Sequence, residues 1–263
     1  MNEETQKLVN EITLPKDFNY PELIRSWTCF DTETTGFTKF DDVLQLSMID
    51  MSGEAINEYF NTRPKVNHLK NGKTSITRKR TWKKSMEVHH ITPKMVNDKL
   101  SLIERKDEFR EIFKRYQIVV GYNVGFDVRM IASNIWYHIE YNSAIVDVLD
   151  LWREYRKKNQ IATPNDKLIT ASKFFGWDYT AYAHNALADV YATIYVFNKL
   201  LEADEELYEK VLNMQKTPYT KKTNSNFKPK TQKIEVKVSK QEPKNIDLSS
   251  FLEDEDDEDI WPY

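Results

Sequence analysis

An apolar segment that ends on two carboxylates, WTCFDTETTGF (27–37), constrains the fold more than any other feature of this sequence. Its first four residues are typical of a buried strand, and Asp31 and Glu33 follow at alternate positions. Because side chains alternate across a strand, both carboxylates are expected on the same face of a sheet. Like charges that close repel each other unless a positive charge lies between them. The segment therefore predicts a strand whose end holds a cation.

The sequence after this segment alternates between strand and helix patterns. Two further strands are expected at 43–51 and 55–63, joined by a tight turn at 52–54. A hairpin followed by alternating helices and strands predicts an α/β domain with a mixed sheet. The later expected elements are a helical stretch at about 93–115, a strand at 117–123, a helix at 128–138, a strand from 143 that leads into a helix or turn, and helices at about 167–174, 186–201 and 204–214.

Composition divides the chain into an N-terminal extension (1–24), a folded domain (25–214) and a tail (215–263). The tail is rich in lysine up to residue 244 and acidic after it. Blocks of like charge with few apolar residues are typical of disorder, so we expect a disordered C-terminal tail. Within the domain, residues 64–86 are polar, rich in Lys and Arg and without clear periodicity, so a long loop or small insertion is expected there.

Bulk properties exclude several classes of protein. Cys29 is the only cysteine, which excludes a disulfide framework and a thiolate zinc site. No apolar run is long enough to span a bilayer, and the polar N-terminus is unlike a secretion signal. The formal net charge of −3 does not by itself indicate a nucleic-acid partner. These properties predict a soluble cytoplasmic protein with no membrane partner.

Further acids stand at positions where a folded domain rarely tolerates a charge. Asp127 lies where an apolar strand gives way to a helix, and Asp189 lies inside the apolar pattern of a long helix, five residues after His184. Each residue alone has an ordinary explanation: a solvated turn for Asp31 and Glu33, a helix cap for Asp127, and an N-terminal helix position or core packing for His184. Their order and local contexts together favour a shared site.

Three segments carry a resemblance to a known family. FDTETTGF, YNVGFD and AHNALAD resemble, in order, the motifs of the DEDDh (DnaQ-like) 3′→5′ exonucleases, over roughly residues 25–200. The resemblance is nearest to the branch that contains the proofreading epsilon subunit of bacterial DNA polymerase III. VHHIT at 88–92 resembles the V-H-G-I-T element of that branch, but His90 replaces its glycine, and Tyr122 replaces a histidine of the second motif. The resemblance implies a ribonuclease-H-like exonuclease fold with a mixed five-stranded sheet flanked by helices.

The resemblance also implies a reaction, the hydrolysis of phosphodiesters with two divalent cations, Mg²⁺ or Mn²⁺, about 4 Å apart. An all-carboxylate set of ligands suits these hard cations. Asp31 would bridge both cations, Glu33 and Asp189 would complete the site that holds the attacking water, and Asp127 would help to hold the second cation. His184 would be the general base that takes the proton of the water.

Residues after the first carboxylate pair are implied to hold the substrate. Gly36 lets the backbone approach a ligand closely. Phe37 offers an apolar face to a terminal base, although ordinary packing would also explain it. The residues that the resemblance assigns to the 3′-terminal nucleotide are Thr34, Thr35, Gly36, Phe37, His89 and Asn123.

A cluster of cations around one aromatic residue lies in the insertion. Its members are Arg78, Lys79, Arg80, Trp82, Lys83 and Lys84. Such a patch can follow a phosphate backbone and stack one base. The structural alternative is a solvated loop.

The chain ends with apolar residues directly after an acidic run at 253–259. They are Ile260, Trp261, Pro262 and Tyr263. An acidic segment with a short apolar end resembles the C-terminal peptide of bacterial single-stranded-DNA-binding proteins, which docks replication and repair enzymes. We expect this tail to recruit a replication or repair protein, to fold back on the basic surface as a DNA mimic, or to be merely solvated.

The resemblance predicts a cytoplasmic enzyme, bacterial or phage-like, that releases nucleoside 5′-monophosphates from the 3′ end of single-stranded DNA in proofreading or repair. RNA trimming is the alternative within the same chemistry. The alternative from another class is an adaptor that binds nucleic acid and acts through its tail without catalysis. The intact set of acids argues against the adaptor.

Overall fold

The computed structural model describes residues 10–68 and 73–214, so the predicted tail at 215–263 lies outside the described residues. The described chain forms two compact units, a large one from residues 10–64 and 78–214 and a small one at 65–77.

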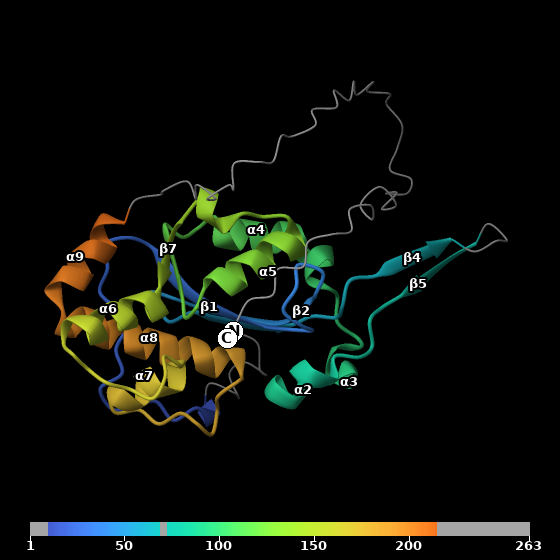
Figure 1. Ribbon diagram of the computed structural model, residues 1–263. Coiled ribbons are helices and arrows are strands. Elements are labelled where there is room, and N and C mark those ends of the chain that lie inside the picture. The colour runs from blue at the N-terminus through green and yellow to red at the C-terminus, as the bar shows by residue number, and fades with distance from the viewer. Residues whose placement is uncertain (1–9, 69–72, 215–263) are drawn as a thin grey trace, which may run out of the picture. The chain divides into compact units, whose positions relative to one another are not determined.

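A mixed five-stranded sheet forms the centre of the large unit (Figure 1). Its central strand β1 runs antiparallel to β2 and parallel to β6, and β7 continues the parallel side. The mixed five-stranded sheet expected from the sequence is therefore confirmed. In order across the sheet, the strands are β3 (Ala55–Tyr59), β2 (Val43–Asp50), β1 (Trp27–Thr34), β6 (Ile118–Gly121) and β7 (Ala144–Asp147).

Helices cover both faces of this sheet (Figure 1). On one face α4 (Lys106–Phe113) and α5 (Gly125–Ile135) pack over Phe30 of β1. On the other face the long helix α8 (Ala186–Ala203) packs over Trp27 and Cys29. Because side chains alternate across β1, this strand contributes to the hydrophobic core on each face of the sheet. Burial of large apolar side chains on both faces stabilises the layered arrangement. The remaining helices on the α8 face are α6 (Val148–Lys158), α7 (Leu168–Phe174) and α9 (Glu205–Asn213).

The expected helical segments exist, but their limits differ from the prediction. The stretch expected at 93–115 divides into α3 (Pro93–Val96), the 3-10 turn η1 (Leu102–Arg105) and α4. Helix α5 begins at Gly125, three residues before the predicted start, and ends where Trp136 takes a left-handed φ of 51°. Asp127 therefore lies in the first turn of α5 rather than before the helix.

The basic insertion contains more regular structure than its sequence suggested. Strands β4 (Lys65–His68) and β5 (Thr74–Thr77) pair as an antiparallel hairpin and form the small unit. Of the two expected alternatives, the paired strands exclude a long loop and agree with a small insertion.

The cation cluster belongs partly to a helix. Helix α2 (Lys83–His89) in the large unit begins directly after Trp82. It ends at His90, which adopts the left-handed φ of 60° that glycine adopts most easily.

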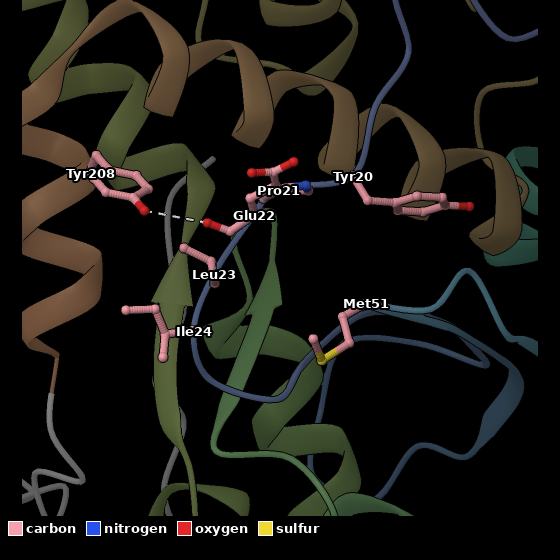
Figure 2. A pocket seen from close by; sticks show the side chains of 7 residues that line it. All are labelled: Tyr20, Pro21, Glu22, Leu23, Ile24, Met51 and Tyr208. Carbon is pink, nitrogen blue, oxygen red and sulfur yellow. Dashed lines mark hydrogen bonds between the residues drawn. The ribbon is translucent and has the colours of Figure 1, made fainter.

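A pocket of about 520 Å³ lies beside the N-terminal segment of the large unit (Figure 2). Residues Tyr20 to Ile24 form one side, and Met51 and Tyr208 complete the lining. The Tyr208 hydroxyl donates to the Glu22 carbonyl at 3.4 Å. None of the predicted site residues lines this pocket, so it is separate from the acids at the end of β1. In the part of the chain that is described, no helix has both the length and the apolar character needed to cross a membrane.

Candidate active site

Three carboxylates meet where the end of β1 faces the first turn of α8. Asp31 and Glu33 point toward the α8 face of the sheet, and Asp189 comes from α8 itself. One ligand oxygen from each residue lies within 4.8 Å of the others. The alternation of β1 delivers the first two, and the burial of Leu187, Ala188 and Val190 around Asp189 fixes the orientation of α8.

The charges of this group oppose one another. Burial raises the pKa of Asp31 and of Glu33 well above their usual values, and repulsion from neighbouring carboxylates raises them further. Burial also raises the pKa of Asp189, to about 7. A divalent cation would remove this repulsion, and three hard oxygen donors suit Mg²⁺ or Mn²⁺. The residues present therefore fit a metal site.

Asp127 approaches β1 from the opposite face of the sheet. Its side chain is only 3% exposed, and its Oδ1 accepts the backbone N–H of Thr32 at 2.9 Å and the Thr32 hydroxyl at 2.6 Å. Asp127 is not part of the three-carboxylate group, but its charge helps to raise the pKa of Asp31. Burial raises the pKa of Asp127 itself to about 7. Its role as a further metal ligand stays a prediction.

Two residues that the sequence did not single out hold the acids in place. Thr32 fixes Asp127, as described above. Tyr179 is buried, and its hydroxyl donates a hydrogen bond to the Asp189 carboxylate. The Tyr179 ring packs 5.6 Å from that of Trp177, between α7 and α8. Thr32 could have been found because it stands between the two motif acids, whereas no local pattern marks Tyr179.

His184 lies just before α8. Its backbone N–H donates to Asp189 Oδ2 at 3.1 Å, and its φ is 67°, which is uncommon for a residue with a side chain. The imidazole is exposed. Partial desolvation and the nearby Lys167 and His90 lower its pKa, so the ring is neutral at pH 7. A neutral imidazole is the form that a general base requires.

His89 is buried, and both of its ring nitrogens make bonds within the protein. Nε2 donates to the Thr34 carbonyl at 3.1 Å, and Nδ1 accepts the N–H of Ile91 at 3.0 Å. His89 therefore holds the turn after β1 in place. Asn123 is exposed, with φ of 56°, and its N–H donates to Asp147 Oδ1 at 2.8 Å. Direct contact of either side chain with a nucleotide stays a prediction.

The turn at 34–37 is tied to itself and to Asp41. The Thr34 hydroxyl donates to the Gly36 carbonyl at 2.6 Å, and the Thr35 hydroxyl donates to Asp41 Oδ1 at 2.9 Å. A Cβ at Gly36 would lie 2.6 Å from the Asp41 carboxylate, so glycine makes room for Asp41. Phe37 is 68% exposed beside this turn, which agrees with an open apolar face.

Most of the predicted cation cluster is engaged within the protein. Trp82 is only 5% exposed and donates its indole N–H to the Ile91 carbonyl at 2.7 Å. Its ring therefore has no open face on which a base could stack, which corrects that part of the expectation. Lys83 and Lys84 are exposed. The other three cations bind Glu104 at 2.9 Å (Arg78), Asp41 at 2.8 Å (Lys79) and Asn97 at 2.6 Å (Arg80).

The predicted partner-binding residues Ile260, Trp261, Pro262 and Tyr263 lie outside the described residues. The recruitment of a partner by the tail stays a prediction.

Comparison with known proteins gives matches over most of the large unit. The family model RNase_T, described as an exonuclease, matches residues 28–197. The PolC-type DNA polymerase III of Staphylococcus epidermidis is 26% identical over 202 residues, which cover 73% of this chain and 12% of the polymerase. The polymerase of Staphylococcus haemolyticus is 27% identical over 191 residues, with 69% and 12% covered. The chain thus spans about an eighth of the length of these relatives.

Solved structures of exonuclease I share the fold. The Escherichia coli enzyme in complex with a dA16 oligonucleotide aligns with a TM-score of 0.57 and 20% identity, over 71% of this chain and 43% of that one. Exonuclease I from Methylocaldum szegediense aligns with a TM-score of 0.55 and 22% identity, over 71% and 42%. The ribonuclease-H-like exonuclease fold expected from the motifs is therefore confirmed.

Proposed function

This chain belongs to the exonuclease family whose model matches residues 28–197, and on that premise we propose that it is a metal-dependent 3′→5′ exonuclease of DNA. The products would be nucleoside 5′-monophosphates. The observation that carries the proposal is the group of Asp31, Glu33 and Asp189, whose ligand oxygens lie within 4.8 Å of one another. A structural role does not explain three half-buried carboxylates that face each other, because their repulsion destabilises the fold.

The acids would hold the divalent cations. Asp31, Glu33 and Asp189 would be direct ligands, and Asp127 would support them. When bound, such cations neutralise phosphate charge and make water a better nucleophile. Tyr179 and the His184 N–H keep the Asp189 carboxylate oriented, as outer partners of metal ligands commonly do.

His184 would take the proton from the attacking water. Its lowered pKa keeps the ring neutral at pH 7, and its exposure leaves the ring open to solvent and substrate. The bond between its N–H and Asp189 places it at the edge of the carboxylate group. Phe37 and the turn at 34–37 would receive the terminal nucleotide.

Two kinds of relative support DNA as the substrate. The similar sequences are DNA polymerases of the PolC type, and the exonuclease I structure above contains a dA16 oligonucleotide. A proofreading or repair role follows from the same resemblance. RNA remains the competing substrate because no described residue is assigned to the 2′ position of the sugar.

The test uses 5′-labelled single-stranded DNA and RNA of one sequence, incubated with the full chain in Mg²⁺ or in EDTA. We expect a ladder that shortens from the 3′ end of the DNA, and its loss in EDTA and in Asp31→Asn. Arg115→Gln is a matched control, because Arg115 is exposed and lies before β6, far from the end of β1. A ladder on RNA alone would reassign the substrate, and the absence of any ladder would overturn the proposal.

A further inference from the structure

Three neighbouring side chains form what we call the Phe37–Arg129 strip: Phe37, Phe126 and Arg129. The rings of Phe37 and Phe126 lie 6.1 Å apart at an angle of 56°. The guanidinium of Arg129 lies over the Phe126 ring, 5.5 Å from its centroid. Phe126 and Arg129 are three residues apart on α5, a spacing that brings side chains together on a helix surface.

The strip is open to solvent at both ends. Phe37 is 68% exposed, Phe126 is partly buried and Arg129 is exposed. Among the residues that the structure describes, Arg129 makes no ion pair with an acid. Stacking on Phe126 holds the guanidinium in place while its N–H groups stay free to bind an anion.

The two elements that carry the strip are fastened together. Asn134 of α5 is 1% exposed, and its amide donates to the Asp41 carbonyl at 3.1 Å and accepts the Val43 N–H at 3.2 Å. Both bonds join α5 to the end of the turn that carries Phe37. The relative position of Phe37 and Arg129 is therefore set by the fold before any ligand binds, which lowers the ordering cost of binding.

The strip flanks the acids in the sequence, because Phe37 follows Glu33 by four residues. Asp127 precedes Arg129 by two residues, yet Asp127 is 3% exposed and faces Thr32, whereas Arg129 faces solvent. Because Arg129 forms no ion pair with these acids among the described residues, its charge is available to a phosphate other than the one that they would hold. It is suited to a neighbouring phosphate of the same strand, with the exposed aromatic offering a surface for the base between them.

We propose that Arg129 binds a phosphodiester of the substrate strand upstream of the one that is cut, and that Phe37 and Phe126 form the surface leading to it. This assignment rests on the proposed function for the identity of the cut phosphate. Its ligand class is a nucleic-acid strand with at least two phosphodiesters. Arg129 is thus a positioning residue that sets how the strand lies against the acids.

The first measurement is binding of 5′-fluorescein-dT8 by fluorescence anisotropy in Ca²⁺, with the integrity of the oligonucleotide checked on a gel. We expect Arg129→Gln to weaken binding about tenfold, since it removes a charge-assisted contact. The slope of log K against log salt should fall by about 0.7, the value for one phosphate of a single strand. Arg115→Gln, which removes the same charge at a distant exposed site, should change neither quantity.

A second set of oligonucleotides locates the contact. Each carries one neutral methylphosphonate, at the second, third, fourth or fifth linkage from the 3′ end. At the contacted linkage, Arg129→Gln should cause no further loss, because the partner charge is already absent. Arg129→Lys should recover part of the affinity, since it restores the charge without the planar pair of donors.

Two results would overturn the proposal: binding by Arg129→Gln that equals that of Arg115→Gln, or losses that add to the methylphosphonate effect at every linkage. Melting temperatures of all variants exclude a folding defect as the cause of any loss. The binding data do not depend on cleavage. The protein could release no nucleotide in Mg²⁺ and still show coupling between Arg129→Gln and the methylphosphonate at one linkage. That result would support the Arg129 contact and refute the proposed exonuclease activity.

Discussion

Two pairs of acids lie close together in the sequence but have opposite surroundings in the fold: Asp31 with Glu33, and Asp41 with Asp42. Only seven residues lie between Glu33 at the end of β1 and Asp41 in the following turn. Asp41 accepts hydrogen bonds from Lys79 at 2.8 Å and from the Thr38 hydroxyl at 2.8 Å. Although burial acts to raise the pKa of Asp41, these bonds lower it below the usual value. Its neighbour Asp42 pairs with Arg63 at 2.5 Å.

Asp31 and Glu33 lack partners of this kind among the described residues. Burial and mutual repulsion raise the pKa of Asp31 and of Glu33 well above the ordinary range, and no lysine or arginine forms an ion pair with them among the described residues. Acids that serve structure are supplied with donors by the fold, as Asp41 is. Acids that have no cationic partner within the protein are candidates for binding a cation from solution.

The largest expected difference concerns Asp31. Asp31→Asn should lower the rate of nucleotide release well beyond the roughly 10- to 100-fold that loss of an outer partner causes. In EDTA the same change should raise the melting temperature, because one of the repelling charges is gone. Rates of nucleotide release from labelled DNA test the first expectation, and calorimetric melting in EDTA tests the second. A variant that is both active and less stable would show that Asp31 belongs with the structural acids.

Tyr179→Phe should have the next largest effect. It removes the hydroxyl that donates to Asp189 while keeping the ring packed beside Trp177. We expect a fall of about 10- to 100-fold in the apparent affinity for Mg²⁺, measured by titrating nucleotide release with the cation. The melting temperature should change little. If the cation titration matches that of the unaltered chain, Tyr179 serves packing alone.

The carboxylates around the end of β1, which include Asp127 and Asp189, should also differ from Asp41 in how pH acts on the stability of the fold. The pKa values of Asp127 and Asp189 are about 7 in the folded chain, against about 4 when unfolded. From about pH 4 until these groups have lost their protons in the folded chain, somewhat above pH 7, the folded state binds more protons than the unfolded state, so stability falls as pH rises. The lowered pKa values of His89 and His184 act with the opposite sign, but only below about pH 6.5.

The informative window is therefore pH 6.5 to 8. In EDTA the free energy of unfolding should decrease by about 2 kcal/mol across this window, and saturating Mg²⁺ should abolish the decrease. Urea denaturation at several pH values measures it. A flat profile in EDTA would mean that the carboxylates at the end of β1 are already compensated within the protein.

The smallest expected effect is at Asp41. Asp41→Asn keeps the shape of the side chain but loses the charge that Lys79 binds at 2.8 Å, so the unfolding free energy should fall by about 1 kcal/mol. The sign is opposite to that of Asp31→Asn in EDTA. Nucleotide release should fall only modestly, since the turn at 34–37 is loosened but the carboxylate group is intact. If Asp31→Asn and Asp41→Asn changed the unfolding free energy equally in EDTA, the distinction between the two pairs of acids would not hold.

Much of the fold was predictable because its signals are local. Strand alternation at 27–34 and the apolar pattern of α8 depend on neighbouring residues, and both are present in the structure. The start of α5 was misplaced because Gly125 reads as a break in a helix, although it begins one here. The β4–β5 hairpin was missed because its charged and polar residues hide the strand period.

The sequence by itself determined which residue types were present at the site and in what order, since motif spacing places Asp31, Glu33, Asp127, His184 and Asp189 at element ends. The tertiary structure alone decided their partners. It brought Asp189 to Asp31 and Glu33, turned Asp127 toward Thr32, buried Trp82 and placed Arg129 over Phe126. The reason is physical: periodicity fixes the face of an element on which a side chain lies, whereas contacts between distant segments depend on how those elements pack.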